Sequence, residues 1–339
     1  MKHFRLSFVF TALCLGLAFW WGIESGKSLY NVMALVIILS ILEVSLSFDN
    51  AVVNASVLKD MDEKWQRYFL TWGILIAVFG MRLVFPIAIV AVTSGLAMNT
   101  VVSLSLEDPE QYSTYLAESH IQVAAFGGIF LFLIFLNYFF QKDKTVHWLG
   151  PLERGLARVS MKVESISIII ALLLILVAQS MLPESDRGPA LLYGLSGIVL
   201  YVIVDSLSKM LSPQAGEAVK RNGFMGFIYL QILDASFSFD GVLGAFAITN
   251  DIIIIMLGLG IGAMFVRSMT IFLVRQGTLE EYVFLEHGAH YAIGALGVIM
   301  LLSMTIHVPE IVTGLIGVAF IAWSLVSSIR HDKRVETND

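Results

Sequence analysis

Two short stretches of this 339-residue chain carry the same pattern of acids and hydroxyls. One runs Glu43-Val-Ser-Leu-Ser-Phe-Asp49 and the other Asp234-Ala-Ser-Phe-Ser-Phe-Asp240, so both read acid-x-Ser-x-Ser-Phe-Asp, 191 residues apart. Carboxylate, hydroxyl and amide oxygens suit Mg²⁺, Ca²⁺ or Mn²⁺ and disfavour Zn²⁺ or Cu⁺. The pattern therefore predicts a metal site, with candidate ligands Asp49, Asp240, Glu43, Asp234, Asn50, Ser47 and Ser238.

The residues around both stretches are apolar enough to lie in a lipid bilayer. Hydrophobic residues make up 57% of the chain and charged residues 14%, whereas soluble domains carry about 25% charged residues. A spanning helix needs roughly 20 apolar residues. The first run, after Lys2 and Arg5, has no small-residue cleavage site at Trp20-Trp21-Gly22, so we expect a retained helix rather than a signal peptide. We predict an all-α polytopic membrane protein with ten spans, at about 7–23, 31–58, 67–94, 120–140, 164–182, 188–211, 224–249, 252–274, 288–306 and 309–329.

The basic residues indicate an orientation for these ten helices. With the N-terminus inside, 17 of the 21 lysines and arginines fall in cytoplasmic segments, and the outer segments hold only Lys27 and Arg187. This asymmetry is a strong positive-inside signal. It predicts a multi-pass protein of the inner (plasma) membrane with both termini in the cytoplasm.

The repeated motif suggests two repeats of five helices each. The first would cover residues 1–182, and the second residues 183–339 with a short cytoplasmic C-terminal tail. Because five is odd, the second repeat would enter the membrane from the opposite side. Inverted repeats with a site near the midplane are typical of secondary transporters. The alternative is chance similarity between two apolar segments.

Charges inside the bilayer are the strongest functional signal. Each costs about 2.5–3.5 kcal/mol on insertion scales, yet the motifs carry four acids and the next helix of each half carries one arginine, Arg82 or Arg267. We expect these arginines to balance part of the negative charge, which leaves a net −2 for one divalent cation. The alternative is that arginine–carboxylate pairs only brace the helices. A compact site would also require a break in each motif helix, near Ser47 and Asn50 and near Ser238 and Gly241.

At Ser45-Leu-Ser-Phe-Asp49-Asn50-Ala-Val-Val53, the sequence resembles the TerC family of bacterial membrane proteins, named for tellurium resistance, and most of all a TerC-related branch of unknown function. The resemblance implies a polytopic inner-membrane protein, and several members of the family are linked to Mn²⁺ export. It makes Asp49 and Asp240 the favoured metal ligands, with Asn50 beside the first. The second motif departs from the pattern with Gly241 in place of Asn50. No soft ligand set for tellurite is found in the sequence.

The leading hypothesis is therefore a divalent-cation transporter, with Mn²⁺ export favoured and Ca²⁺ or Mg²⁺ as alternatives. Its partners would be the lipid bilayer and the ion that it carries as substrate, with no permanently bound cofactor, no nucleic acid and no enzymatic activity. Two rival classes are an intramembrane aspartyl enzyme, whose Gly-x-Gly-Asp signature is absent, and a non-transporting metal sensor or scaffold linked to tellurite resistance. The acidic outer segment 95–119 is expected to be a solvated loop.

Overall fold

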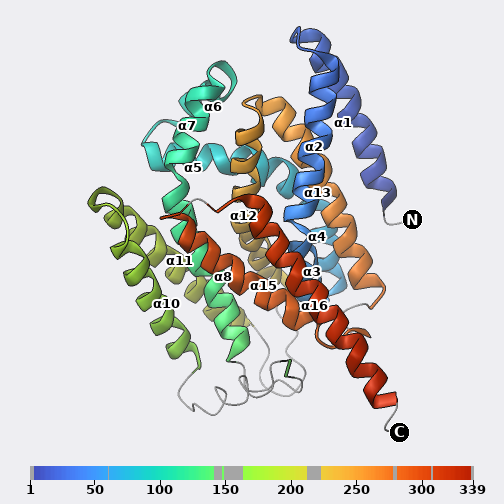
Figure 1. Ribbon diagram of the computed structural model, residues 1–339, viewed down its shortest axis with the longest axis vertical. Helices are drawn as coiled ribbons and strands as arrows, with labels where there is room; N and C mark the ends of the chain where they lie inside the picture. The colour runs from blue at the N-terminus through green and yellow to red at the C-terminus, as the bar shows by residue number, and fades with distance from the viewer. Residues whose placement is uncertain are drawn as a thin grey trace. The chain divides into compact units, whose positions relative to one another are not determined.

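The computed structural model describes residues 4–59, 61–140, 147–148, 163–211, 223–277, 281–306 and 308–336. Throughout these ranges the regular structure is helical (Figure 1). Within the described ranges, seven helical stretches are long and apolar enough to cross a membrane: Arg5–Glu24, Leu29–Leu46, Ile76–Ser94, His120–Phe139, Glu184–Ser206, Ile252–Arg275 and Leu285–Ser303. This finding confirms a multi-pass, all-helical protein. Helices also occupy the other predicted spans, but the total of ten remains a prediction.

Contacts divide the chain into two compact units, each drawn from separate parts of the sequence. Unit 1 comprises Met1–His120 and Lys220–Arg275, and unit 2 comprises Ile121–Val219 and Gln276–Asp339. Both predicted repeats, 1–182 and 183–339, therefore contribute to both units. A sequence repeat need not be a packing unit, so the division into repeats stays a prediction.

Unit 1 contains both motifs and both intramembrane arginines. Its helices are α1 (Arg5–Glu24), α2 (Leu29–Leu46), α3 (Phe48–Leu58), α4 (Glu63–Leu75), the π-helix η2 (Ile76–Val84), α5 (Phe85–Ser94), α6 (Met98–Glu107), α7 (Pro109–Glu118), α12 (Gly223–Ile248) and α13 (Ile252–Arg275). Unit 2 contains α8 (His120–Phe139), which begins one residue before the unit does, and α10 (Val163–Ser180), α11 (Glu184–Leu211), α15 (Leu285–Ser303) and α16 (Glu310–Glu336).

The two motif helices differ in continuity. The first is interrupted at Ser47, where φ is −103° and ψ is 16°, so that α2 ends and α3 begins. The second, α12, runs without interruption through Ser238 and Gly241. The predicted break is therefore present in the first motif helix. The prediction of a break in the second motif helix is wrong. Glycine at position 241 gives close approach to a neighbour here rather than a bend, as described below.

The acidic segment after α5 is not a solvated loop. It forms the amphipathic helices α6 and α7, separated at Asp108, whose carboxylate caps α7 by accepting a hydrogen bond from the Gln111 N–H at 3.1 Å. Tyr112 is 1% exposed and its ring lies 5.5 Å from that of Phe246. The buried residues recur at helical spacing, a signal that the dense acidic residues of this segment obscured.

Candidate metal centre

Glu43 lies at the end of α2, is 2% exposed, and has one fully engaged carboxylate oxygen. Oε1 accepts hydrogen bonds from Arg82 Nη2 and, at 2.9 Å, from Ser47 Oγ. Arg82 is itself fixed within η2, because its Nη1 donates to the backbone carbonyl of Ala77. π-helical turns are frequent at functional sites. The break at Ser47 and the π-helix together hold a hydroxyl and a guanidinium on one carboxylate.

Asp234, in the middle of α12, is held differently. Its Oδ1 accepts a hydrogen bond of 2.8 Å from Asn50 Nδ2, and its Oδ2 lies 3.5 Å from Arg267 Nη2. Arg267 donates at 3.0 Å to the carbonyl of Phe69 and at 2.7 Å to that of Gly73, and its guanidinium stacks 4.0 Å from the Phe69 ring centre. Asp234 therefore shares its arginine with the backbone of α4.

The first motif helix runs antiparallel to α12, and the contacts follow the motif. Glu43 faces Gly241, where an added Cβ would lie 3.1 Å from Oε2, and Asn50 pairs with Asp234. Further along, Met61 faces Gly226. Because the motifs are 191 residues apart, Glu43 corresponds to Asp234 and Asn50 corresponds to Gly241. The contact between Glu43 and Gly241 is therefore the counterpart of the contact between Asp234 and Asn50. The two contacts are thus equivalent positions of one antiparallel crossing, with a glycine in one copy where the other has an amide.

Glycines in α13 bring that helix onto α2 beside the site. A Cβ on Gly262 would lie 2.4 Å from Glu43 Cβ, and one on Gly258 would lie 2.5 Å from Leu39 Cβ. Ser40 Oγ donates to the Gly258 carbonyl at 3.1 Å. This is the small-xxx-small packing of membrane helices, and Figure 1 shows α2 and α13 side by side. It buries Glu43 away from lipid.

The structure places the other predicted ligands less completely. Ser238 is buried on α12. Asp49 belongs to the first turn of α3 and Asp240 to α12, but the side chains of both lie outside the described residues. Among the described histidines, cysteines and acids, no group of three or more is placed to hold a metal ion. The described part of the site therefore consists of two acid–arginine pairs, with Asn50 on α3 donating to the acid of the second pair on α12.

Two buried amides extend this polar cluster. Asn54, one turn after Asn50, is 3% exposed, and Gln231, one turn before Asp234, is 9% exposed. Gln231 was not among the ligands predicted from the sequence. An amide three residues before an acid in an apolar helix was the signal that could have identified it, because both then lie on one helix face.

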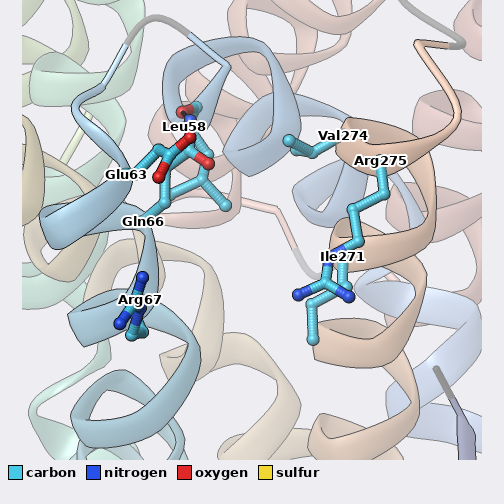
Figure 2. Close-up of a pocket in the computed structure, with 7 residues that line it drawn as sticks. All are labelled: Leu58, Glu63, Gln66, Arg67, Ile271, Val274 and Arg275. Atoms are coloured by element: carbon cyan, nitrogen blue, oxygen red, sulfur yellow. Dashed lines mark hydrogen bonds between the residues drawn. The ribbon is translucent and has the colours of Figure 1, made fainter.

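A separate pocket of about 250 Å³ opens where α3, α4 and α13 end or begin. Figure 2 shows Arg67 and Arg275 on opposite walls, with Glu63 and Gln66, from the first turn of α4, on the same side as Arg67. Gln66 donates to the carbonyls of Leu58 and Met61, which closes the α3–α4 turn. With two arginines to one acid, this pocket is unlike the carboxylate cluster and disfavours cations.

The sequence matches the family described as "Protein of unknown function (DUF475)" over residues 48–335. The chain belongs to this family. No curated protein matches it, and no solved structure matches it. The DUF475 match begins inside the first motif, at Phe48, and includes Asp49, Arg82, the whole second motif and Arg267. The family description names no activity, so the functional argument rests on the site.

Proposed function

We propose that this DUF475 protein transports a divalent cation across the membrane, with Mn²⁺ favoured, and that the carboxylates of the two motifs form its ion site. One observation carries the proposal: both motifs meet in a single antiparallel crossing inside unit 1, with an arginine on one acid of each. Acids in spanning helices are rare and mark ion pathways. Discontinuous helices in transporters also expose backbone carbonyls to the ion, and α2 and α3 supply such a break.

Charge balance supports a divalent substrate. The two arginines pair with Glu43 and Asp234, so the formal charges of Asp49 and Asp240 are the two negative charges left over in the motifs. One divalent cation cancels them. Without it, the carboxylates would repel each other and take up protons instead. Competition between protons and the ion then offers a route to exchange.

The antiparallel crossing also supports the inverted-repeat interpretation. In that arrangement ten spans form two repeats of five, both termini are cytoplasmic, and the protein lies in the inner membrane. The preference for Mn²⁺ over Ca²⁺ or Mg²⁺ comes from the resemblance to TerC proteins, which remains part of the proposal. The protein is then a carrier rather than an enzyme.

The test uses purified protein in proteoliposomes. Wild type should move Mn²⁺, and Asp49→Asn or Asp240→Asn should abolish both transport and the Mn²⁺-dependent rise in melting temperature. The apo melting temperature should stay unchanged or rise, because like-charge repulsion is removed. Binding stabilises the folded state through mass action, so this shift reports the site directly. Glu110→Gln, in the exposed first turn of α7, is the matched control.

Flux of Mn²⁺, Ca²⁺ and Mg²⁺ measured in parallel identifies the substrate. A full Mn²⁺-dependent shift in the Asp49→Asn and Asp240→Asn double variant would exclude these aspartates as ligands. An inert wild type, with all three ions, would favour the sensor or scaffold.

A further inference from the structure

Gln231 and Asn54 carry buried polar atoms without hydrogen-bond partners in the described part of the chain. Both amide atoms of Gln231 and the Oδ1 of Asn54 are in this position. An unsatisfied buried polar group costs about 1–3 kcal/mol by mutational measures. Buried polar groups are otherwise almost always satisfied by protein or water. These two side chains therefore mark a place that admits water or a hydrated ligand.

The two amides lie at one level of the seam between α3 and α12. The helices are antiparallel, and Asn50 pairs with Asp234. Asn54, one turn after Asn50, and Gln231, one turn before Asp234, therefore lie at the same depth. That level lies on the side where Met61 meets Gly226 and where the segment with Lys59 and Lys64 follows α3. The distribution of basic residues assigns this end to the cytoplasm.

The two equivalent positions on the opposite side of the crossing, both among the described residues, are not unsatisfied amides. At the 191-residue offset, Asn54 corresponds to Ala245 and Gln231 to Ser40. Ala245 is fully buried, and Ser40 Oγ is satisfied by donation to the carbonyls of Val36 and Gly258 at 2.7 and 3.1 Å. The seam is thus polar and unsatisfied on one side of the acids, and apolar or satisfied on the other.

We propose that Gln231 and Asn54 line a hydrated passage between the carboxylates and the cytoplasmic end of the α3–α12 seam, and that they bind the cation through its water shell. This inference rests on the proposed function. Mg²⁺-like ions give up water reluctantly, and neutral amide oxygens accept hydrogen bonds from such water without trapping the charge. The pocket of Figure 2, at the same end, is lined by Arg67 and Arg275 and is a poorer entrance for a cation.

Thiol labelling tests the passage without relying on transport. In a Cys14→Ala background, Gln231→Cys and, for comparison, Ala245→Cys, at the counterpart of Asn54, would be exposed to a small, charged, membrane-impermeant methanethiosulfonate. We expect Gln231→Cys to react from the cytoplasmic side at least about tenfold faster than Ala245→Cys from either side, because a dry apolar site suppresses the reactive thiolate. Mn²⁺ should slow the reaction. Asn54→Cys is the second variant, should Gln231→Cys fail to fold.

Equal or slower labelling of the folded Gln231→Cys and Asn54→Cys proteins would overturn the passage, as would faster labelling from the outer side. Gln231→Leu provides the second measurement. It should lower Mn²⁺ flux by about tenfold, keep the Mn²⁺-dependent melting shift and leave the apo protein at least as stable. Unchanged flux, or a clear loss of apo stability, would show that the amide is structural.

The labelling and flux measurements separate the two proposals. If wild type moves none of the three ions while Gln231→Cys labels as expected, the transport proposal fails and the passage stands. If wild type transports Mn²⁺ but neither cysteine labels, the ion site survives and the passage is wrong.

Discussion

The two intramembrane arginines have different partners, although each lies on the helix that follows its motif. Arg82 donates directly to Glu43, while its Nε has no hydrogen-bond partner in the described part of the chain. Arg267 lies 3.5 Å from Asp234 and donates instead to two backbone carbonyls. Glu43 therefore accepts a direct hydrogen bond from its arginine, whereas the direct donor to Asp234 is the amide of Asn50 and its arginine lies further away.

We expect Arg82→Ala to destabilise the protein by about 3–5 kcal/mol, because it leaves the carboxylate of Glu43 buried and uncompensated. Removing that charge as well, in Arg82→Ala with Glu43→Gln, should recover most of the loss. The measurement is a double-mutant cycle on thermal or denaturant unfolding in detergent. Additive effects in the two single variants would show that the pair does not couple.

Asp251 is a second, partly buried anchor, just before the membrane span of α13. It caps α13 by accepting hydrogen bonds from the N–H groups of Ile253 and Ile254 at 3.0 and 3.2 Å. Its other oxygen accepts from Lys27 Nζ at 2.5 Å and Trp21 Nε1 at 3.0 Å. Burial alone would raise the pKa of Asp251, but these donors outweigh it and hold that pKa below the ordinary value of 3.8.

A lowered pKa in the folded state adds stability above the ordinary pKa, and that stability is lost as the pH falls through the folded value. Asp251→Asn keeps an oxygen for the cap but removes the ion pair, so it should reduce stability by about 1 kcal/mol at pH 7. The difference from wild type should persist to about pH 5 and shrink below about pH 4. Melting curves across this range check it; a difference that grows on acidification would contradict the assignment.

At the scale of elements, α2 and α13 pack through glycine contacts that a side chain would disturb. Gly262→Ala would force a Cβ to within 2.4 Å of Glu43 Cβ, and we expect a loss of about 1–3 kcal/mol from this overpacking. Gly260→Ala is the matched control, because its Cβ would make ordinary contacts, at 3.4 Å to Val78 Cγ1 and at 3.7 Å or more to the Phe10 ring. That variant should stay within about 0.5 kcal/mol of wild type. Equal melting temperatures for both would show that the helices separate without cost.

Hydrophobic run lengths sufficed to place the helices, but their irregularities depend on tertiary contacts. The predicted span 67–94 is the continuous stretch α4–η2–α5, and nothing in its composition distinguishes the π-helix, which accompanies the contact from Arg82 to Glu43. Both motifs carry residues suited to a break, yet only Ser47 interrupts a helix. The sequence repeat conveys the equivalence of Glu43 and Asp234 but not which neighbours each acquires.

At the scale of the molecule, the membrane orientation is still a prediction of the basic residues. We expect cysteines at Thr114, on α7, and at Gln276, directly after α13, to be labelled from opposite faces in the Cys14→Ala background, with Thr114→Cys outside. Both positions are exposed and belong to helices or turns that tolerate small side chains. Labelling of both from one face would contradict an orientation with cytoplasmic termini.

Sequence reasoning could not anticipate how the units are composed. The sequence divides into two consecutive repeats, whereas unit 1 combines α1 to α7 with α12 and α13. The reason is physical: Glu43 is covered by Gly262 and Gly241, and Arg267 by Phe69 and Gly73, so each motif is completed by residues from the other half. In the sequence, the signal for these contacts between the two halves was the presence of acids and an arginine in each repeat.

The interleaving of the two units has a consequence for biosynthesis. A ribosome delivers α2, with Glu43 and the face that later receives Gly258 and Gly262, before it has made residues 121–219 of unit 2. During that interval Arg82 is the partner that can neutralise Glu43, since α12 and α13 do not yet exist. We therefore expect the Glu43–Arg82 pair to form first, before α12 and α13 complete the contacts of unit 1.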